Sequence, residues 1–87
     1  MKIYAFHDSK LSEFGQPFYF QATGQAVRLL QDLVRDPKTT IAQHPGDFRL
    51  YALGNYDPTS GTFENLSAPQ LIADASSFVE HANGKNS

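Results

Sequence analysis

Two short segments place aromatic and cationic side chains at alternating positions, an arrangement that can stack on nucleobases and contact phosphates. The segments are residues 2–8 and 48–57. Side chains two apart in a strand share one face of a sheet, and single-stranded nucleic acid needs aromatic faces with cations beside them. Two further cations, near the end of a predicted helix, are candidates to contact the backbone of the nucleic acid. The candidate interface comprises Lys2, Tyr4, Phe6, Arg35, Lys38, Arg49 and Tyr51.

The aromatic members of this set have a second interpretation. Tyr4, Phe6 and Tyr51 are large, and side chains of this kind are mostly buried in folded proteins. The sequence therefore favours a core or dimer contact for them, unless both segments present the same sheet face and that face is turned away from the helix.

The remaining residues do not suggest catalysis or metal binding. His7, His44 and His81 lack the spacing of metal ligands, and His44 is interpreted as a loop residue that closes its own turn rather than as a general base. The chain has no P-loop, G-x-S-x-G or G-x-G-x-x-G motif. We therefore expect a non-enzymatic protein with no catalytic residues, no metal and no cofactor.

Length and composition limit the class of protein. With 87 residues the chain is long enough for one domain, which we place at residues 1–82, with a frayed tail at 83–87. The absence of Cys excludes disulfides, and a formal net charge of -2 argues against coating nucleic acid by charge alone. Asp8 and Lys10 precede any long apolar run, so we expect neither a secretory signal nor a membrane span.

The first half of the chain predicts two strands and a helix. Residues 2–8 alternate as a strand does, and the aromatic run 17–22 predicts a second strand that begins with Pro17. The polar segment 9–16 between them is predicted as a loop. Apolar residues then recur at helical spacing up to Asp36, with Thr23 as the expected N-cap and Pro37 as the stop.

The second half predicts a hairpin. Residues 37–47 form a connection that can hold a single helical turn around Ile41 and Ala42. Residues 48–57 and 62–66 alternate on either side of a turn that Pro58 and Gly61 suit. Most of the aromatic and branched residues in this segment are therefore explained by their structural role in the hairpin.

The C-terminal part has two interpretations. Leu71, Ala75, Phe78 and Ala82 fit one helix that starts near Ser67. Alternatively, residues 70–73 form a short fifth strand followed by a short helix from residue 76 or 77. The predicted order, β-β-α-β-β-α with the last element either a helix or a short strand and helix, is typical of a small α+β two-layer domain with an antiparallel sheet of about four strands.

The segments MKIYAFHDSK, PFYF, QAVRLLQDLVRDP and especially HPGDFRLYALGNYDPTSG resemble a known family. They are similar to the small nonstructural proteins of gokushovirus-type microviruses, tailless phages with circular single-stranded DNA genomes. The resemblance runs from Met1 to about Leu66 and is most specific from His44 through Asp57. It implies a non-capsid role during infection, described generally as DNA binding linked to the production or packaging of single-stranded genomes.

The sequence and the resemblance together predict a protein that binds single-stranded DNA in the cytoplasm of the host cell, as a homodimer and without a membrane. The alternative is an adaptor that engages a phage or host replication or assembly protein through the same aromatic surface and has no affinity for DNA. A regulator of double-stranded DNA is disfavoured, because Asp32 and Asp36 stand beside the arginines of the predicted helix.

Overall fold

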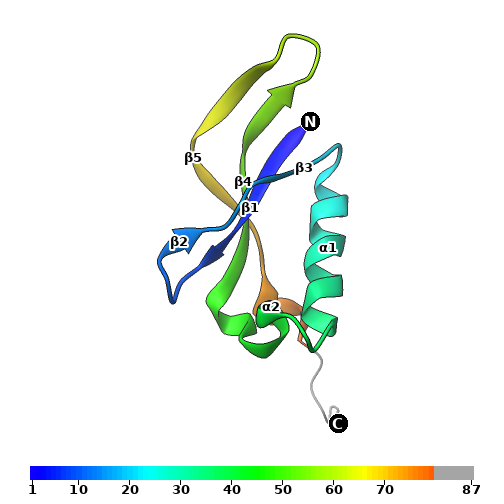
Figure 1. Ribbon diagram of the computed structural model, residues 1–87, viewed down its shortest axis with the longest axis vertical. Helices are drawn as coiled ribbons and strands as arrows, with labels where there is room; N and C mark the ends of the chain where they lie inside the picture. Colours follow the sequence, from blue (N-terminus) through cyan, green and yellow to red (C-terminus); the bar gives the residue numbers. More distant parts are fainter. Residues whose placement is uncertain (80–87) are drawn as a thin grey trace.

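β1 (Lys2–Asp8) is the centre of a five-stranded antiparallel sheet. The computed structural model describes residues 1–79. In it, β1 pairs with β4 (Phe48–Asp57) on one side and with β2 (Glu13–Phe14) and β3 (Phe18–Phe20) on the other (Figure 1). The strands predicted at residues 2–8 and 48–57 are confirmed with the same limits.

One edge of the sheet is made by β2 and β3 together. Both strands pair with β1, and residues 15–17, which include Pro17, separate them. Within this break Gly15 donates its N–H to the carbonyl of Phe6 at 2.8 Å. The strand predicted at 17–22 is confirmed over residues 18–20. The prediction of a loop at 9–16 is wrong at residues 13–14, which form β2. A strand of two residues is too short to show the alternation of apolar and polar residues that predicts a strand.

The other edge is β5 (Thr62–Asp74), which forms a long hairpin with β4 that projects beyond the helix (Figure 1). The turn is the predicted one: the Asp57 carboxylate accepts the N–H of Thr59 at 2.9 Å, and Gly61 has a φ of 72°. The register then shifts, so that residues 66–69 of β5, including Pro69, lie opposite the single residue Leu53 of β4. This break divides β5 into two paired halves.

The helix predicted from residue 67 onward is wrong for the described residues. Residues 70–74 continue β5, and a short 3-10 helix, η2 (Ala75–Phe78), follows. The alternative with a strand at 70–73 is closer, although this strand is the second half of β5. Pairing with β4 is the physical reason, since it satisfies backbone groups that a helix would leave open on β4. The tail predicted at 83–87 lies outside the described residues.

α1 (Thr23–Arg35) packs along one face of the sheet (Figure 1). Its limits agree with the predicted helix, but Thr23 is not the N-cap. Ala22 occupies that position, and its N–H donates to the Oε1 atom of Gln25 at 2.9 Å. The Thr23 hydroxyl instead shares a hydrogen bond of 2.9 Å with the Tyr4 hydroxyl, which ties the helix start to the central strand.

The connection after α1 contains α2 (Thr40–Gln43) and a 3-10 turn, η1 (Pro45–Asp47). The Thr39 hydroxyl caps α2, accepting the N–H of Ala42 at 3.0 Å and donating to the carbonyl of Leu33 at 2.7 Å. The predicted helical turn is thereby confirmed, and it brings Ile41 into the core.

The core fills the space between α1 and the sheet face that carries Tyr4 and Leu50. These two side chains and Leu30 of α1 are fully buried. Burial of each leucine contributes about 1.5–3 kcal/mol to folding. A helix layer on one face of an antiparallel sheet is the predicted α+β architecture, which is confirmed.

Candidate nucleic-acid interface

The face of the sheet opposite α1 carries most of its exposed rings. Directly paired residues of adjacent strands share a face, and the core marks the face that α1 covers. We call the other side the open face. From the strand pairings its members are Ile3, Ala5, His7, Phe14, Tyr19, Arg49, Tyr51, Tyr56, Phe63, Leu71 and Asp74.

Three residues of the predicted interface lie on the covered face. Tyr4 has no exposed surface, and Phe6 packs against the core with its ring centroid 5.1 Å from that of Phe18. Lys2 shares their side of β1 and is exposed. Tyr4 and Phe6 therefore face α1 and pack in or against the core, the interpretation that the sequence favoured for them, so they are not placed to stack on bases of a ligand on the open face.

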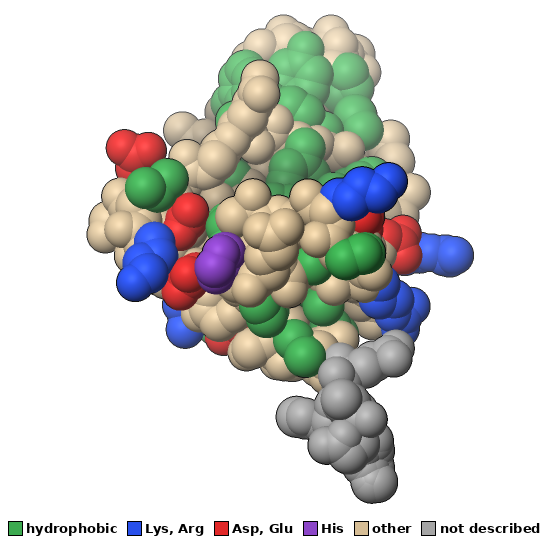
Figure 2. Space-filling view, turned by 60° about the horizontal axis from the view of Figure 1, so that its bottom comes forward, with side chains coloured by type: hydrophobic (Ala, Val, Ile, Leu, Met, Phe, Trp, Pro, Cys, Tyr) green, Lys and Arg blue, Asp and Glu red, His purple; other side chains and the backbone are tan. Residues whose placement is uncertain are grey.

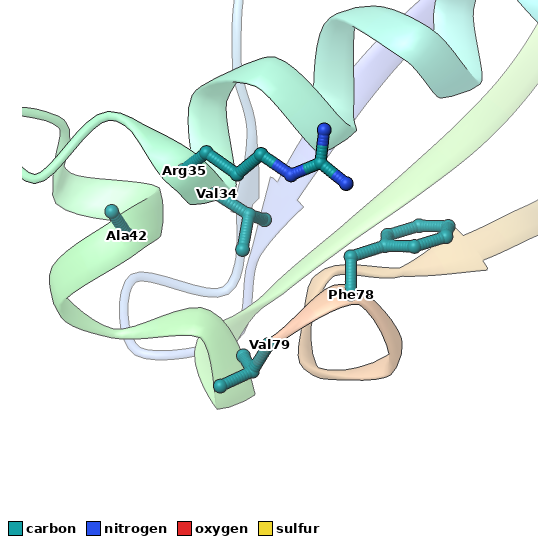
Figure 3. Close-up of a pocket in the computed structure, with 5 residues that line it drawn as sticks. All are labelled: Val34, Arg35, Ala42, Phe78 and Val79. Carbon is teal, nitrogen blue, oxygen red and sulfur yellow. The ribbon is translucent and has the colours of Figure 1, made fainter. Parts of the chain in front are cut away.

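Arg35 and Lys38 lie elsewhere, at and after the C-terminal end of α1. Arg35 lines a pocket with Val34, Ala42, Phe78 and Val79, where α1, α2 and η2 meet, and its guanidinium extends toward the Phe78 ring (Figure 3). This pocket is on the helix side of the sheet. The structure therefore does not bring Arg35 and Lys38 together with the remaining two predicted residues.

Arg49 and Tyr51 are on the open face, as neighbours on β4. Tyr51 belongs to a cluster with His7 and Phe14 that we call the central rings. Their centroids are 5.4 Å apart for Phe14 and Tyr51, 4.7 Å for His7 and Phe14, and 6.1 Å for His7 and Tyr51. All three pairs meet edge to face. Phe14 is 44 % exposed, so this cluster presents an aromatic surface to solvent.

The sequence did not indicate His7 and Phe14 as site residues. Because His7 alternates with Lys2, Tyr4 and Phe6 along the strand, it lies on the opposite side of β1 from them, and the candidate interface did not include it. Phe14 lay in the predicted loop. The signal that identifies it is its pairing with His7 across β1 and β2, which only the fold reveals.

Arg49 is held by an ion pair with the carboxylate of Asp74 across β4 and β5, at 3.2 Å. Partial burial raises the pKa of Asp74. Hydrogen bonds from the side chain and backbone of Ser76, at 2.8 and 3.0 Å, and the charge of Arg49 outweigh this effect. The net result is a pKa of Asp74 below its ordinary value, so the carboxylate stays ionised and orients Arg49.

We expect the stability of the protein to fall at acidic pH in part through Asp74. The lowered folded-state pKa means that the contribution is fully present above the unfolded value of about 3.9 and is lost as pH falls through the folded pKa. Asp74→Asn should therefore have a lower urea midpoint than the wild type at pH 7 and approach it at pH 3. A hydrogen bond from the backbone of Thr59 also lowers the pKa of Asp57, so the wild type alone would show the effect of both carboxylates. The difference between the wild type and Asp74→Asn isolates the contribution of Asp74. An equal difference at both pH values would contradict the prediction.

A second aromatic group lies on the open face nearer the end of the hairpin. Tyr56 is central, with its ring centroid 6.0 Å from that of Tyr19 and 4.9 Å from that of Phe63. We call these three the hairpin rings. With Met1 and Gly61 they line a shallow depression. Figure 2 shows hydrophobic side chains gathered over the upper part of the molecule, where the hairpin projects, and charged side chains around its lower half.

The described part of the chain offers little for other kinds of site. Within residues 1–79, His, Asp and Glu side chains do not form a group of three that could hold a metal ion. No helix there is long and apolar enough to cross a lipid bilayer.

A family model described as Phage ORF5 protein matches residues 1–78 of the chain. The chain belongs to the Phage ORF5 protein family. It is therefore a phage protein, and the ORF5 match includes every strand and both aromatic groups of the open face. No curated protein and no solved structure gives a significant match.

Proposed function

We propose that this phage protein binds single-stranded DNA on the open face of its sheet, with Tyr51 and Phe14 stacking on bases and Arg49 contacting the phosphate backbone. The observation that carries the proposal is the placement of Arg49 beside the central rings on the one sheet face that α1 leaves uncovered. A ring and a cation on neighbouring positions of a sheet are the minimal elements of single-strand binding.

Exposure and geometry support this role. Phe14 is 44 % exposed and meets Tyr51 edge to face, so a base can lie on the Phe14 ring without displacing its partner. Stacking of a base on such a ring contributes about 1–3 kcal/mol and tolerates any sequence. Arg49, whose side chain is 37 % exposed, keeps donors available despite its pair with Asp74.

The charge of the chain bears on how it would act. A formal net charge of -2 gives weak general attraction to DNA. A homodimer would place two copies of Arg49 and of the central rings along one strand. We infer a non-enzymatic role in the replication or packaging of a single-stranded genome in the host cytoplasm, in keeping with the resemblance to microvirus nonstructural proteins.

The direct test is fluorescence anisotropy of a labelled single-stranded oligonucleotide, with a duplex of the same sequence as the control. We expect preference for the single strand, since stacked bases in a duplex are not available to the rings. Raising the salt concentration should weaken binding modestly, with a log–log slope of about -1 to -2 for one or two phosphate contacts. Absence of binding at low salt would overturn the proposal.

A second candidate is an adaptor for a phage or host replication or assembly protein. Phe63 and Leu71 favour it, because they are 57 % and 53 % exposed on the open face and carry no charge. Such a patch is typical of protein contacts. The adaptor predicts a protein partner that binds the open face, together with no measurable affinity for DNA.

A further inference from the structure

The hairpin rings repeat the arrangement of the central rings on the same face of the same strand. Tyr51 and Tyr56 both belong to β4, and each has two ring neighbours: those of Tyr51 come from β1 and β2, and those of Tyr56 from β3 and β5. The bulge at Leu53 makes this possible. It shifts the register between Tyr4 and Ile3, so that residues five apart on β4 point to one side instead of opposite sides.

The hairpin rings are open to a ligand. Phe63 is 57 % exposed and Tyr19 is 38 % exposed, and the depression that they line with Tyr56 has a volume of about 470 Å³. The rings are tilted or edge-on to each other rather than stacked face to face. A flat ring of another molecule can therefore lie against Phe63 and extend the cluster.

The charges nearby suit an anionic strand. The hairpin carries Asp57 and Glu64, but both belong to strand pairs that alternate to the opposite side from Tyr56 and Phe63. The one carboxylate of the open face among the described strand residues is Asp74, and Arg49 neutralises it. A phosphate backbone that crosses this face from the central rings to the hairpin rings meets no unpaired carboxylate of these strands.

The distance between the two groups sets the length of strand that reaches both. Tyr51 and Tyr56 are five residues apart on β4, which corresponds to about 16 Å at roughly 3.3 Å per residue. Stacked nucleotides advance about 3.4 Å each. A stacked dinucleotide or tetranucleotide is therefore too short to occupy both groups, while about six stacked nucleotides suffice.

We propose that the hairpin rings form a second base-stacking site, so that one protein chain holds two separated bases of one DNA strand. This inference rests on the proposed function and extends it by naming the second site and the length of strand that it requires. The affinity should therefore rise in a step once the oligonucleotide spans both groups. One further stacked base gives an increase of about 5- to 150-fold.

The test is a series of thymidine oligonucleotides of two, four, six and eight nucleotides, titrated into the wild type and into Phe63→Ala. We expect the step in the wild type, and its loss in Phe63→Ala with unchanged affinity for the dinucleotide. Leu66→Ala is the matched control: Leu66 is also an exposed apolar residue of β5, at 42 %, but it lies in the break and outside the hairpin rings. It should keep the step. Thermal unfolding of both variants checks that the fold is intact.

The outcomes separate this inference from the proposed function. If no oligonucleotide binds, both fail. If short oligonucleotides bind but affinity does not rise in a step, or the step persists in Phe63→Ala, the second site is overturned and the central rings stand. If Phe63→Ala keeps the step and instead changes the sedimentation coefficient of the DNA-free protein, the hairpin rings are a contact between copies of the chain, which also overturns the second site.

Discussion

Gly54→Ala should destabilise the protein by about 3 kcal/mol and lower its melting temperature by roughly 12–24 °C. Gly54 is buried in the middle of the sheet, paired with Ile3 on one side and Asn65 on the other. A Cβ atom at this position would penetrate the backbone carbonyl of Glu64 and lie 3.0 Å from the Cα atom of Asn65. Because these are backbone atoms, β5 would have to move away and lose its pairing with β4.

Gly46→Ala is the matched control for this effect. A Cβ atom at Gly46 would have no atom within 4 Å apart from its chain neighbours. Its melting temperature should stay within a few degrees of the wild type, as measured by circular dichroism. If Gly54→Ala melted at the same temperature as Gly46→Ala, β5 would accommodate the methyl group at little cost, and the close approach at Gly54 would not be a structural requirement.

The double substitution of Arg49 and Tyr51 by Ala should weaken binding of single-stranded DNA by about 30- to 1000-fold. The loss combines one stacked base with one charge-assisted contact, together about 2–4 kcal/mol. The fold should lose much less, about 1–2 kcal/mol, because the Arg49 ion pair is partly exposed and Tyr51 is half-buried. Anisotropy measured well below the melting temperature separates the two effects.

Two control variants make this measurement specific. Tyr51→Phe keeps the ring and should bind almost as the wild type does. Arg28→Ala removes the same charge from the exposed side of α1, on the other side of the sheet, and should change affinity little. Equal losses in Arg28→Ala and in the double variant would show that general charge, and not the open face, governs binding.

The strands and the long helix were predictable because local pattern and tertiary packing agree there. Residues 2–8 and 48–57 alternate as strands do, and they form β1 and β4. The apolar residues at helical spacing end before Pro37, and they form α1. The C-terminal helix was wrong because Leu71, Ala75 and Phe78 have a helical spacing by coincidence. Leu71 pairs with Tyr51 of β4, and β5 continues to Asp74 before Ala75 and Phe78 form the short η2, so strand pairing overrides local helical propensity.

The site was only half predictable, because β1 is apolar on both faces. Tyr4 and Phe6 on one side and Ile3 and Ala5 on the other are all candidates for the core, and no local rule chooses between them. The choice depends on which face α1 covers, a contact between distant parts of the chain. Arg49 and Tyr51 were placed together correctly because they are two apart on one strand.

The two edges of the sheet share a feature that affects behaviour at high concentration. Each edge is interrupted by a segment containing a proline, residues 15–17 with Pro17 on one side and residues 66–69 with Pro69 on the other. Long uninterrupted edges invite strands of other molecules and lead to fibrils. These interruptions leave short ladders at each edge, so we expect edge-to-edge aggregation of this phage protein to be disfavoured even at high concentration.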